Sequence, residues 1–486
     1  MKMKTKTLTF AQTEKLRLKR EKEIRKWEKE KAKPKQGFYM AFLVFIICVV
    51  YVTDEIASQI GTLMKTEIAT DLLARYGESS IGLLDLAGMV AIPFSLLSLF
   101  YKPLADRYGR KIFLIINTLG MSAAMFVIFL SGNLYLYLAG VCIMSFFIPH
   151  DMQVVYIMES APPKYRATMY SIVKAIATFG IMLVPLFRRI LMTEASEWRM
   201  VYLVPAVLGM VISFIALIFT KETDAFIDSR LRYLRMTDEE REQEKQKKDS
   251  QGAQGGFVAA MKFVAHHKQL KWLYVTVALS TIGVLITMQY QAIISYGYAE
   301  NYLSQGLFKS LEEALNSVAV NEVTSALFLF PIGSGLAQLI HGFISDKWGR
   351  KCSSVVVAVI TIISLVLFSV GSKNAWSPYI VGLFSGASVG AFWSCGDIVG
   401  LMVSESAPTN LRSSIISTQF IAMGVGYAVA YGVGLPLITA LGNSAISKIV
   451  LGLALPGLLL SLVVLITKVK ETKGANLGQV TGSEWD

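Results

Sequence analysis

Long apolar runs alternate with short polar segments along most of the chain. A run of about 20 apolar residues can cross a hydrocarbon core of about 30 Å as a helix. Lipid offers backbone polar groups no partner, so such runs must be helices or strands of a closed barrel. The period-two alternation of a barrel strand does not recur here. The pattern predicts an all-α integral membrane protein with twelve transmembrane helices, over residues 38–61, 80–101, 111–131, 134–157, 168–190, 200–220, 272–297, 322–345, 352–371, 376–403, 413–440 and 445–467.

A polar stretch separates the first six runs from the last six, and this divides the chain into five segments. They are a basic tail (1–36), a six-helix bundle (37–220), a linker (221–271), a second six-helix bundle (272–467) and a C-terminal tail (468–486).

Two motifs occur in both halves at matching places. "DMQVVYIMESAPPKYR" (151–166) and "DIVGLMVSESAPTNLR" (397–412) share Asp, seven residues, Glu-Ser-Ala-Pro, three residues and Arg. "KPLADRYGRK" (102–111) similarly corresponds to "GFISDKWGRK" (342–351). A duplicated set of six helices with a cleft where the halves meet is typical of secondary transporters. The repeats therefore predict two pseudo-symmetric bundles.

The composition agrees with a membrane protein, because only 17% of the residues are charged against roughly a quarter in soluble proteins. Most of the Lys and Arg residues fall in the N-terminal tail and in segments on the same side of the predicted membrane, which places both termini in the cytoplasm. The net charge of +12 is thus a topology signal and not a nucleic-acid-binding surface. We expect a multi-pass protein of the cell (plasma or inner) membrane.

No enzymatic or metal-binding signature accompanies these helices. The four Cys and four His residues lack zinc-site or disulfide spacing, and no HExxH, GxSxG, Walker A or dinucleotide motif has a supporting context. The sequence predicts neither an enzyme nor a cofactor or metal. The expected partners are a small-molecule solute, protons and the lipid bilayer, with no nucleic acid, and the chain is expected to be a monomer.

The motifs resemble those of the major facilitator superfamily. Its pattern Gly-x-Leu-x-Asp-x-x-Gly-Arg-Lys is present at 102–111, where Lys102 replaces the first Gly, and again at 342–351. The Glu-x-x-Pro-x-x-x-Arg segments and "ETKG" (471–474) further resemble the sugar porters and related organic-ion transporters. The resemblance covers nearly all of 37–474 and implies the major facilitator fold.

Two features depart from the sugar porters. The seventh run, "TMQYQAIISYGY", lacks their Gly-x-Asn, and the fourth run lacks their arginine. The substrate class therefore stays open between a sugar-like solute and an organic acid.

The charged residues of the repeated motifs fall just beyond helix ends on the predicted cytoplasmic face. Carboxylates and guanidinium groups at such places form charge-assisted bonds, and in the family that the chain resembles these bonds close the cytoplasmic side. The alternative is that they only anchor loops and set topology. The predicted cytoplasmic gate comprises Asp106, Arg110, Glu159, Arg166, Asp346, Arg350, Glu405 and Arg412.

Several charged residues are predicted within the membrane. Asp151 and Asp397 precede the motif glutamates by eight residues, about 12 Å deeper along a helix. Lys174 reaches the same depth as Asp151, so the two are expected to pair. No lysine occupies the matching position in the second half, so we predict that Asp397 binds a proton or a cationic group; hydrogen-bonded polar packing is the alternative. Asp54 stands where sugar porters carry an acid linked to proton coupling, a role that the resemblance implies.

The candidate substrate-binding residues are Gln289, Gln291, Tyr296, Trp393 and Asp397, which offer donors, acceptors and aromatic faces. Asp85 is expected near the outer surface. By contrast, the small-xxx-small spacing of Gly382, Gly386 and Gly390 predicts close helix packing. The basic N-terminal segment is either a helix lying on anionic lipid or a solvated tail.

These observations predict a secondary transporter that moves a small organic solute by alternating access, as a proton-coupled symporter. One alternative is a proton-coupled exporter of organic cations or drugs. Another is a transporter-like sensor that binds a solute without moving it.

Overall fold

The computed structural model describes residues 10–32, 38–101, 104–148, 152–160, 166–237, 239–241, 243, 257–408 and 411–474. Within these ranges the secondary structure is helical and contains no strand. Ten helical stretches are long and apolar enough to cross a membrane, and the apolar helix α8 is shorter. The all-α membrane architecture predicted from the apolar runs is therefore confirmed.

Several predicted spans consist of two successive helices. In the first half the helices are α2 (Tyr39–Leu63), α3 (Lys65–Leu72), α4 (Ser80–Gly88), α5 (Ile92–Tyr101), α6 (Ala105–Tyr108), α7 (Arg110–Phe129), α8 (Leu134–Phe147), α9 (Met152–Ser160), α10 (Arg166–Gly180), α11 (Leu183–Leu191) and α12 (Trp198–Phe219). In the second half they are α16 (Lys268–Ser280), α17 (Val284–Ser304), α18 (Leu311–Val318), α19 (Thr324–Trp348), α20 (Arg350–Lys373), α21 (Pro378–Ser406), α22 (Arg412–Val429), α23 (Leu435–Leu441) and α24 (Ile446–Lys468). The connecting helices α13 (Asp224–Arg235) and α15 (Phe257–His266) lie between the halves in sequence.

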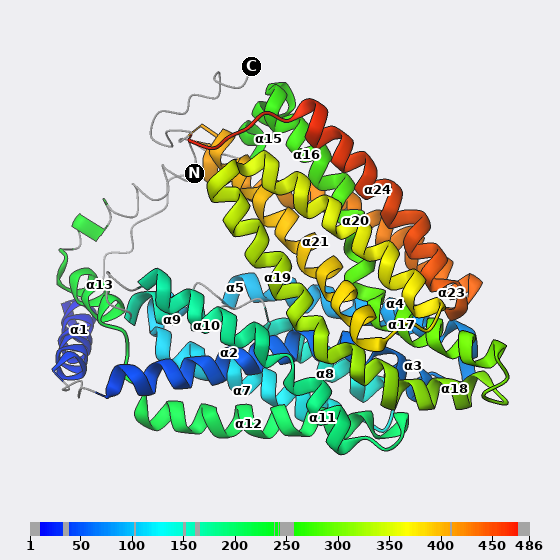
Figure 1. Cartoon of the computed structure of the whole chain (residues 1–486). Helices are drawn as coiled ribbons and strands as arrows, with labels where there is room; N and C mark the ends of the chain where they lie inside the picture. The colour runs from blue at the N-terminus through cyan, green and yellow to red at the C-terminus, as the bar shows by residue number, and fades with distance from the viewer. Residues whose placement is uncertain are drawn as a thin grey trace.

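The two sets of helices form two groups that lie at an angle to each other (Figure 1). Helices α2, α7, α11 and α12 run together, as do α19, α20, α21 and α24. We call the end at which α2 begins and α24 finishes the terminal end, and the opposite end the far end. The groups touch at the far end, where α3 contacts α17, α4 contacts α23 and α11 contacts α19, and they diverge toward the terminal end.

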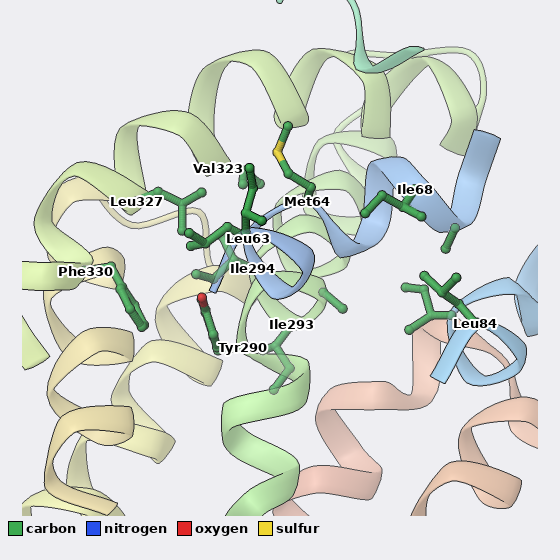
Figure 2. Close-up of a cluster of buried hydrophobic side chains, with 14 of the residues drawn as sticks. Leu63, Met64, Ile68, Leu84, Tyr290, Ile293, Ile294, Val323, Leu327 and Phe330 are labelled. Atoms are coloured by element: carbon green, nitrogen blue, oxygen red, sulfur yellow. The ribbon is translucent and has the colours of Figure 1, made fainter. Parts of the chain in front are cut away.

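A buried apolar cluster lies where the two groups touch (Figure 2). The members labelled in the figure come from α2, α3, α4 and the junction between α2 and α3 in the first half, and from α17, α19 and the π-helical turn before α19 in the second. The labelled side chains are Leu63, Met64, Ile68, Leu84, Tyr290, Ile293, Ile294, Val323, Leu327 and Phe330. This cluster excludes water from the contact and holds the far end together.

The predicted close packing of the glycine-rich tenth run is confirmed. A Cβ on Gly382 or Gly386 would lie 1.9 Å from the backbone oxygen of Ala326 or Phe330 of α19. Gly390 continues the same face one turn further along α21. Only glycine allows the two backbones to approach this closely.

The N-terminal segment forms helix α1 (Phe10–Lys31), which packs on α13 at the terminal end (Figure 1). Trp27 is buried, and its ring meets that of Phe226 edge-on at 5.3 Å. Arg230 pairs with Glu23 at 2.6 Å. The described part of the tail is thus a docked helix and not a solvated tail.

Candidate functional site

A cavity of about 300 Å³ lies within the first half, against the second. Lys65 of α3 and Asp85 of α4 line it and form an ion pair, with Lys65 Nζ 2.6 Å from Asp85 Oδ1. Their side chains are only 7% and 9% exposed. Asp85 Oδ2 accepts a hydrogen bond from Gln289 Nε2 of α17 at 2.6 Å. A buried ion pair at a cavity wall is therefore bonded directly to the other half.

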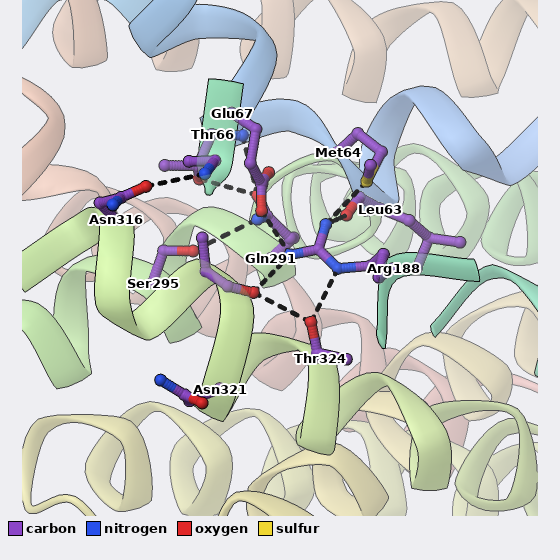
Figure 3. Close-up of polar contacts among 12 residues, drawn as sticks. Leu63, Met64, Thr66, Glu67, Arg188, Gln291, Ser295, Asn316, Asn321 and Thr324 are labelled. Atoms are coloured by element: carbon purple, nitrogen blue, oxygen red, sulfur yellow. Dashed lines mark hydrogen bonds and ion pairs between the residues drawn. The ribbon is translucent and has the colours of Figure 1, made fainter. Parts of the chain in front are cut away.

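A second polar network crosses between the halves at the far end, around Arg188 of α11 (Figure 3). The Arg188 guanidinium is fully buried and pairs with Glu67 of α3. It also donates to Thr324 Oγ1 at 3.1 Å and to the backbone oxygen of Ala319 at 2.7 Å, both in the second half. Buried charges are costly unless they are paired and hydrogen-bonded. Glu67 of the same half supplies the opposite charge, and the hydrogen bonds to Thr324 and Ala319 form only while the halves touch.

Gln291 of α17 completes this network. Its Nε2 donates to Glu67 Oε2 at 3.0 Å and to Ser295 Oγ at 3.2 Å. Its Oε1 accepts from both the backbone nitrogen and the hydroxyl of Thr66, at 3.0 and 2.7 Å. The amide group of Gln291 is thus fully engaged in joining the halves.

The outer rim of the far end adds further contacts between the halves. Asn443 Oδ1 of the second half accepts from the backbone nitrogen of Ile81 in the first half at 3.2 Å. Asn443 Nδ2 donates to Tyr296 Oη, within the second half, at 2.8 Å. A cavity of about 740 Å³ lies beside these contacts and is lined from both halves, with Ser196 on one side and Glu312 on the other.

At the terminal end, the first-half motif residues form a compact cluster. Arg110 Nε donates to Glu159 Oε1 at 3.0 Å, and Thr223 Oγ1 donates to Glu159 Oε2 at 2.6 Å. Glu222 accepts from the backbone nitrogens of Arg110 and Lys111 at the start of α7. The positive end of the helix dipole stabilises a carboxylate at that position.

The second half repeats this cluster contact for contact. Arg350 Nε donates to Glu405 Oε1 at 3.3 Å, Thr472 Oγ1 donates to Glu405 Oε2 at 2.6 Å, and Glu471 accepts from the backbone nitrogens of Arg350 and Lys351. Each of these two clusters joins segments within one half of the chain.

The motif glycines are required by this arrangement. Gly109 and Gly349 adopt φ of 120° and 111°, values that residues with a Cβ rarely adopt. A Cβ on Gly109 would lie 2.2 Å from Glu222 Oε2, and one on Gly349 would lie 2.3 Å from Glu471 Oε2. Glycine at these positions lets the carboxylates reach the starts of α7 and α20.

The pKa values of the two equivalent acids, Glu222 and Glu471, are shifted in opposite directions. Burial raises the pKa of Glu222, and the charge of Glu159 adds to this effect, although backbone N–H donors oppose it. Burial opposes ionisation of Glu471 as well, but four backbone N–H donors outweigh it and lower the pKa. As the pH falls, Glu222 therefore loses its charge before Glu471.

Glu222 and Thr223 were not among the residues predicted from the sequence, although a signal for them exists. Lys-Glu-Thr at 221–223 repeats Lys-Glu-Thr at 470–472, directly after the sixth and twelfth spans. The first copy lies at the start of the polar linker, where charged and polar residues are common, so these three residues do not stand out as a motif.

The remaining predicted gate residues fall into two groups. Asp346 accepts from Arg350 Nη1 at 3.0 Å, and Arg412 donates to the backbone oxygens of Ser404 and Ala407 at the end of α21. The side chains of Asp106 and Arg166 lie outside the described part of the structure.

The predicted coupling residues are placed in part. Asp54 is buried and accepts from Gln153 Nε2 of α9 at 2.7 Å. Asp397 is exposed on α21 and takes part in a polar or electrostatic interaction. Asp151 and the side chain of Lys174 lie outside the described residues, so their pairing stays a prediction.

The predicted substrate-binding residues do not form one group. Gln289 and Gln291 of α17 take part in the contacts between the halves, and Tyr296 of the same helix accepts from Asn443 within the second half. Trp393, 43% exposed, and Asp397 lie on α21 instead. Their binding role stays a prediction.

The sequence predicts that Asp85 lies near the outer surface, and the structure places its buried side chain on α4, at the far end. The segment before it folds into α3 and a short 3-10 helix (Ala74–Ser79) that pack against the second half, so Asp85 is buried beneath them.

Comparison with known families agrees with this architecture. Residues 37–314 match the model of the Major Facilitator Superfamily, and residues 285–473 match that of the Sugar (and other) transporter family. The first match covers more than half of the chain, so the chain belongs to the Major Facilitator Superfamily. Membership in this family of transporters also confirms that the chain is not an enzyme.

The most similar relatives include a Low-affinity glucose transporter of Kluyveromyces lactis, 29% identical over 128 residues that make up 25% of this chain and 22% of that protein. The High-affinity hexose transporter HXT6 of Saccharomyces cerevisiae is 30% identical over 104 residues, 21% of this chain and 18% of that protein. The matched segments thus span about a fifth of these relatives.

Solved structures share the fold over nearly the whole chain. The crystal structure of a D-xylose-proton symporter has a TM-score of 0.58 at 15% identity, covering 90% of this chain and 99% of that one. A bacterial homolog of the human lysosomal transporter Spinster, in an inward-facing and unoccupied conformation, gives 0.55 at 13% identity, with 93% and 98% covered. At these identities the likeness shows the fold alone.

Proposed function

We propose that this chain is a monomeric secondary transporter that moves a small organic solute by alternating access, as a proton-coupled symporter. The observation that carries the proposal is the contrast between the two ends. At the far end, the Arg188 network and the Asp85–Gln289 bond join the two halves. At the terminal end, each Arg–Glu–Thr cluster lies within one half.

Such a molecule can rock about its centre. The far-end network satisfies buried charges in one state, and water can satisfy the same charges when that end opens. The terminal-end clusters hold the helix ends of each half rigid, so that the halves move as bodies, and they form the faces that would meet when the terminal end closes.

The distribution of basic residues places the terminal end in the cytoplasm. The state described here is then closed to the outside and open to the inside of the plasma or inner membrane. The similar structures described as inward-facing support this assignment.

The relatives support the class of solute and the coupling ion. Two are named as glucose and hexose transporters, and a D-xylose-proton symporter shares the fold. Asp54, buried and bonded to Gln153, is a candidate proton carrier because a buried carboxyl exchanges its proton readily when its environment changes.

Uptake into proteoliposomes tests the proposal. The purified full chain would be reconstituted and supplied with labelled sugars, organic acids and organic cations, with and without an inside-alkaline gradient. Solute accumulation driven by that gradient is expected. Expulsion of cations would indicate an exporter and not a symporter. Binding of a probe without transport of any probe would indicate a sensor.

A further inference from the structure

We infer that Lys65 and Asp85 form a site that binds a proton together with a small monocarboxylate: Asp85 binds the proton, and Lys65 then binds the carboxylate. This inference rests on the proposed function, because it names the substrate class and a coupling acid for the same transport cycle. It adds a location, the 300 Å³ cavity whose wall the pair forms.

The ion pair makes the two binding events depend on each other. Lys65 Nζ is 2.6 Å from Asp85 Oδ1, and both side chains are nearly buried. A proton on Asp85 forms an O–H bond, removes the negative charge and leaves the Lys65 ammonium buried without a counter-ion. That situation is unfavourable in the membrane interior. A carboxylate that enters the cavity restores the pair, so proton and anion favour each other's binding equally.

The second oxygen of Asp85 lets this exchange occur without breaking the contact between the halves. Oδ2 accepts from Gln289 Nε2, and Gln289 Oε1 has no hydrogen-bond partner among the described residues. When Asp85 is protonated, its O–H can donate to Oε1 after the amide group turns over. The bond between the halves then persists, and only Lys65 is released.

Among the described residues, Lys65 and Asp85 are the charged side chains that line this cavity. The titratable side chains that line it are Lys65 from α3, Asp85 from α4, Tyr137 from α8, Tyr202 from α12 and Tyr431 from the π-helical turn after α22. Tyrosines with a pKa near or above 10 are neutral at physiological pH. Among the described lining residues, Lys65 is thus the one cation available to an anionic solute.

The lining also specifies the body of the solute. A volume of about 300 Å³ is at the lower limit for ligand pockets. Besides the ion pair, the lining consists of three tyrosines, the hydroxyl side chains of Ser58, Thr62 and Ser145, and apolar side chains such as Met144 and Ile148. This lining suits a short apolar or aromatic body.

Transport by matched variants tests the inference. Full-length wild type, Lys65→Gln, Lys65→Arg and Asp85→Asn would be reconstituted, with Lys373→Gln, an exposed lysine on α20, as the control. The probes are labelled para-hydroxybenzoate, D-glucose and D-xylose, corrected for protein-free liposomes. Wild type and Lys373→Gln are expected to accumulate para-hydroxybenzoate in an inside-alkaline gradient, with no effect of an imposed membrane potential. Lys65→Gln should reduce the accumulation of para-hydroxybenzoate on the order of tenfold or more, and Lys65→Arg should retain most of this accumulation.

Asp85→Asn imitates the protonated acid, so it should exchange para-hydroxybenzoate across the membrane but lose the response to the pH gradient. In detergent, the same probe should stabilise wild type against thermal unfolding more at acidic than at alkaline pH, and Asp85→Asn equally at both. Folding of each variant is checked by the same unfolding measurement.

Proton-driven uptake of sugars alone, or unchanged para-hydroxybenzoate uptake in Lys65→Gln, would overturn this inference and leave the proposed function standing. Absence of gradient-driven uptake for all three probes would overturn both.

Discussion

Replacing Glu67 with Gln is expected to open the far end. Glu67 and Arg188 are both 0% exposed, and the substitution leaves the guanidinium buried without its carboxylate. Removing one partner of a buried ion pair costs about 3–5 kcal/mol. In a state with the far end open, water solvates Arg188, and an exposed pair contributes only about 0–1 kcal/mol. The cost therefore falls almost entirely on the closed state.

This difference has a large effect on populations. Because about 1.4 kcal/mol corresponds to a factor of ten, the substitution should shift the ratio of open to closed molecules by roughly 100- to 4,000-fold. A ligand needs about 10⁴-fold selectivity to invert a ratio of 99:1. The variant should thus populate the open state measurably without any solute.

Distances between spin labels at Ser196 and Glu312 report this change. Both residues are exposed and line the far-end cavity from opposite halves. The labels would be introduced as cysteines after replacement of the four native ones, Cys48, Cys142, Cys352 and Cys395. Glu67→Gln should add a population of longer distances. Glu313→Gln, an exposed acid on the same cavity that accepts from the backbone of Lys309, serves as the control. Identical distance distributions in the Glu67→Gln variant and its parent would refute the reasoning.

Three further substitutions test other parts of the structure. Gly349→Ala forces a Cβ against Glu471 at φ 111°, so thermal unfolding should show a loss of stability of about 1–3 kcal/mol. Gly335→Ala, whose Cβ would have no neighbour within 4 Å, should show no such loss, and equal losses in the two variants would contradict the predicted strain. Thr472→Val removes a 2.6 Å hydrogen bond to buried Glu405 and should lower the free energy of unfolding by about 1.5–3 kcal/mol. Thr467→Val, at an exposed position, should lower it much less, and similar unfolding temperatures for the two variants would contradict the predicted role of the bond. Trp27→Ala removes the largest side chain between α1 and α13, and such a truncation in a packed core lowers stability by about 3–5 kcal/mol. Trypsin should therefore cleave within α1 faster in this variant than in the control Lys29→Arg, and equal cleavage rates would show that Trp27 does not hold the helix.

The membrane helices and the duplicated clusters could be predicted because their signals are local. Apolar runs specify spans residue by residue, and a motif that recurs after equivalent helices indicates equivalent environments. The Arg110–Glu159 and Arg350–Glu405 contacts follow from the repeated motifs alone. Their threonine and glutamate partners after the sixth and twelfth spans also repeat, in a segment whose composition resembles a linker.

The contacts between the halves left no such signal. Arg188 lies near the end of a largely apolar run, and its partner in the other half, Thr324, is 136 residues away. Gln291 bonds to Glu67 across 224 residues. Periodicity indicates which face of a helix is buried, but the identity of a distant polar partner depends on how the helices assemble. Asp85 illustrates this, because the segment that covers it is polar enough to resemble an exposed loop.

The docking of α1 on α13 has a consequence for biosynthesis. Glu23 and Arg230, which pair in the finished molecule, are 207 positions apart, so at roughly 5–20 residues per second a ribosome needs roughly 10–40 seconds between them. During that interval six spans enter the bilayer before α13 has been made, so α1 has no partner helix and Trp27 is not covered by Phe226. In a nascent chain, the basic helix α1 and its Trp27 therefore stay exposed until α13 has been made.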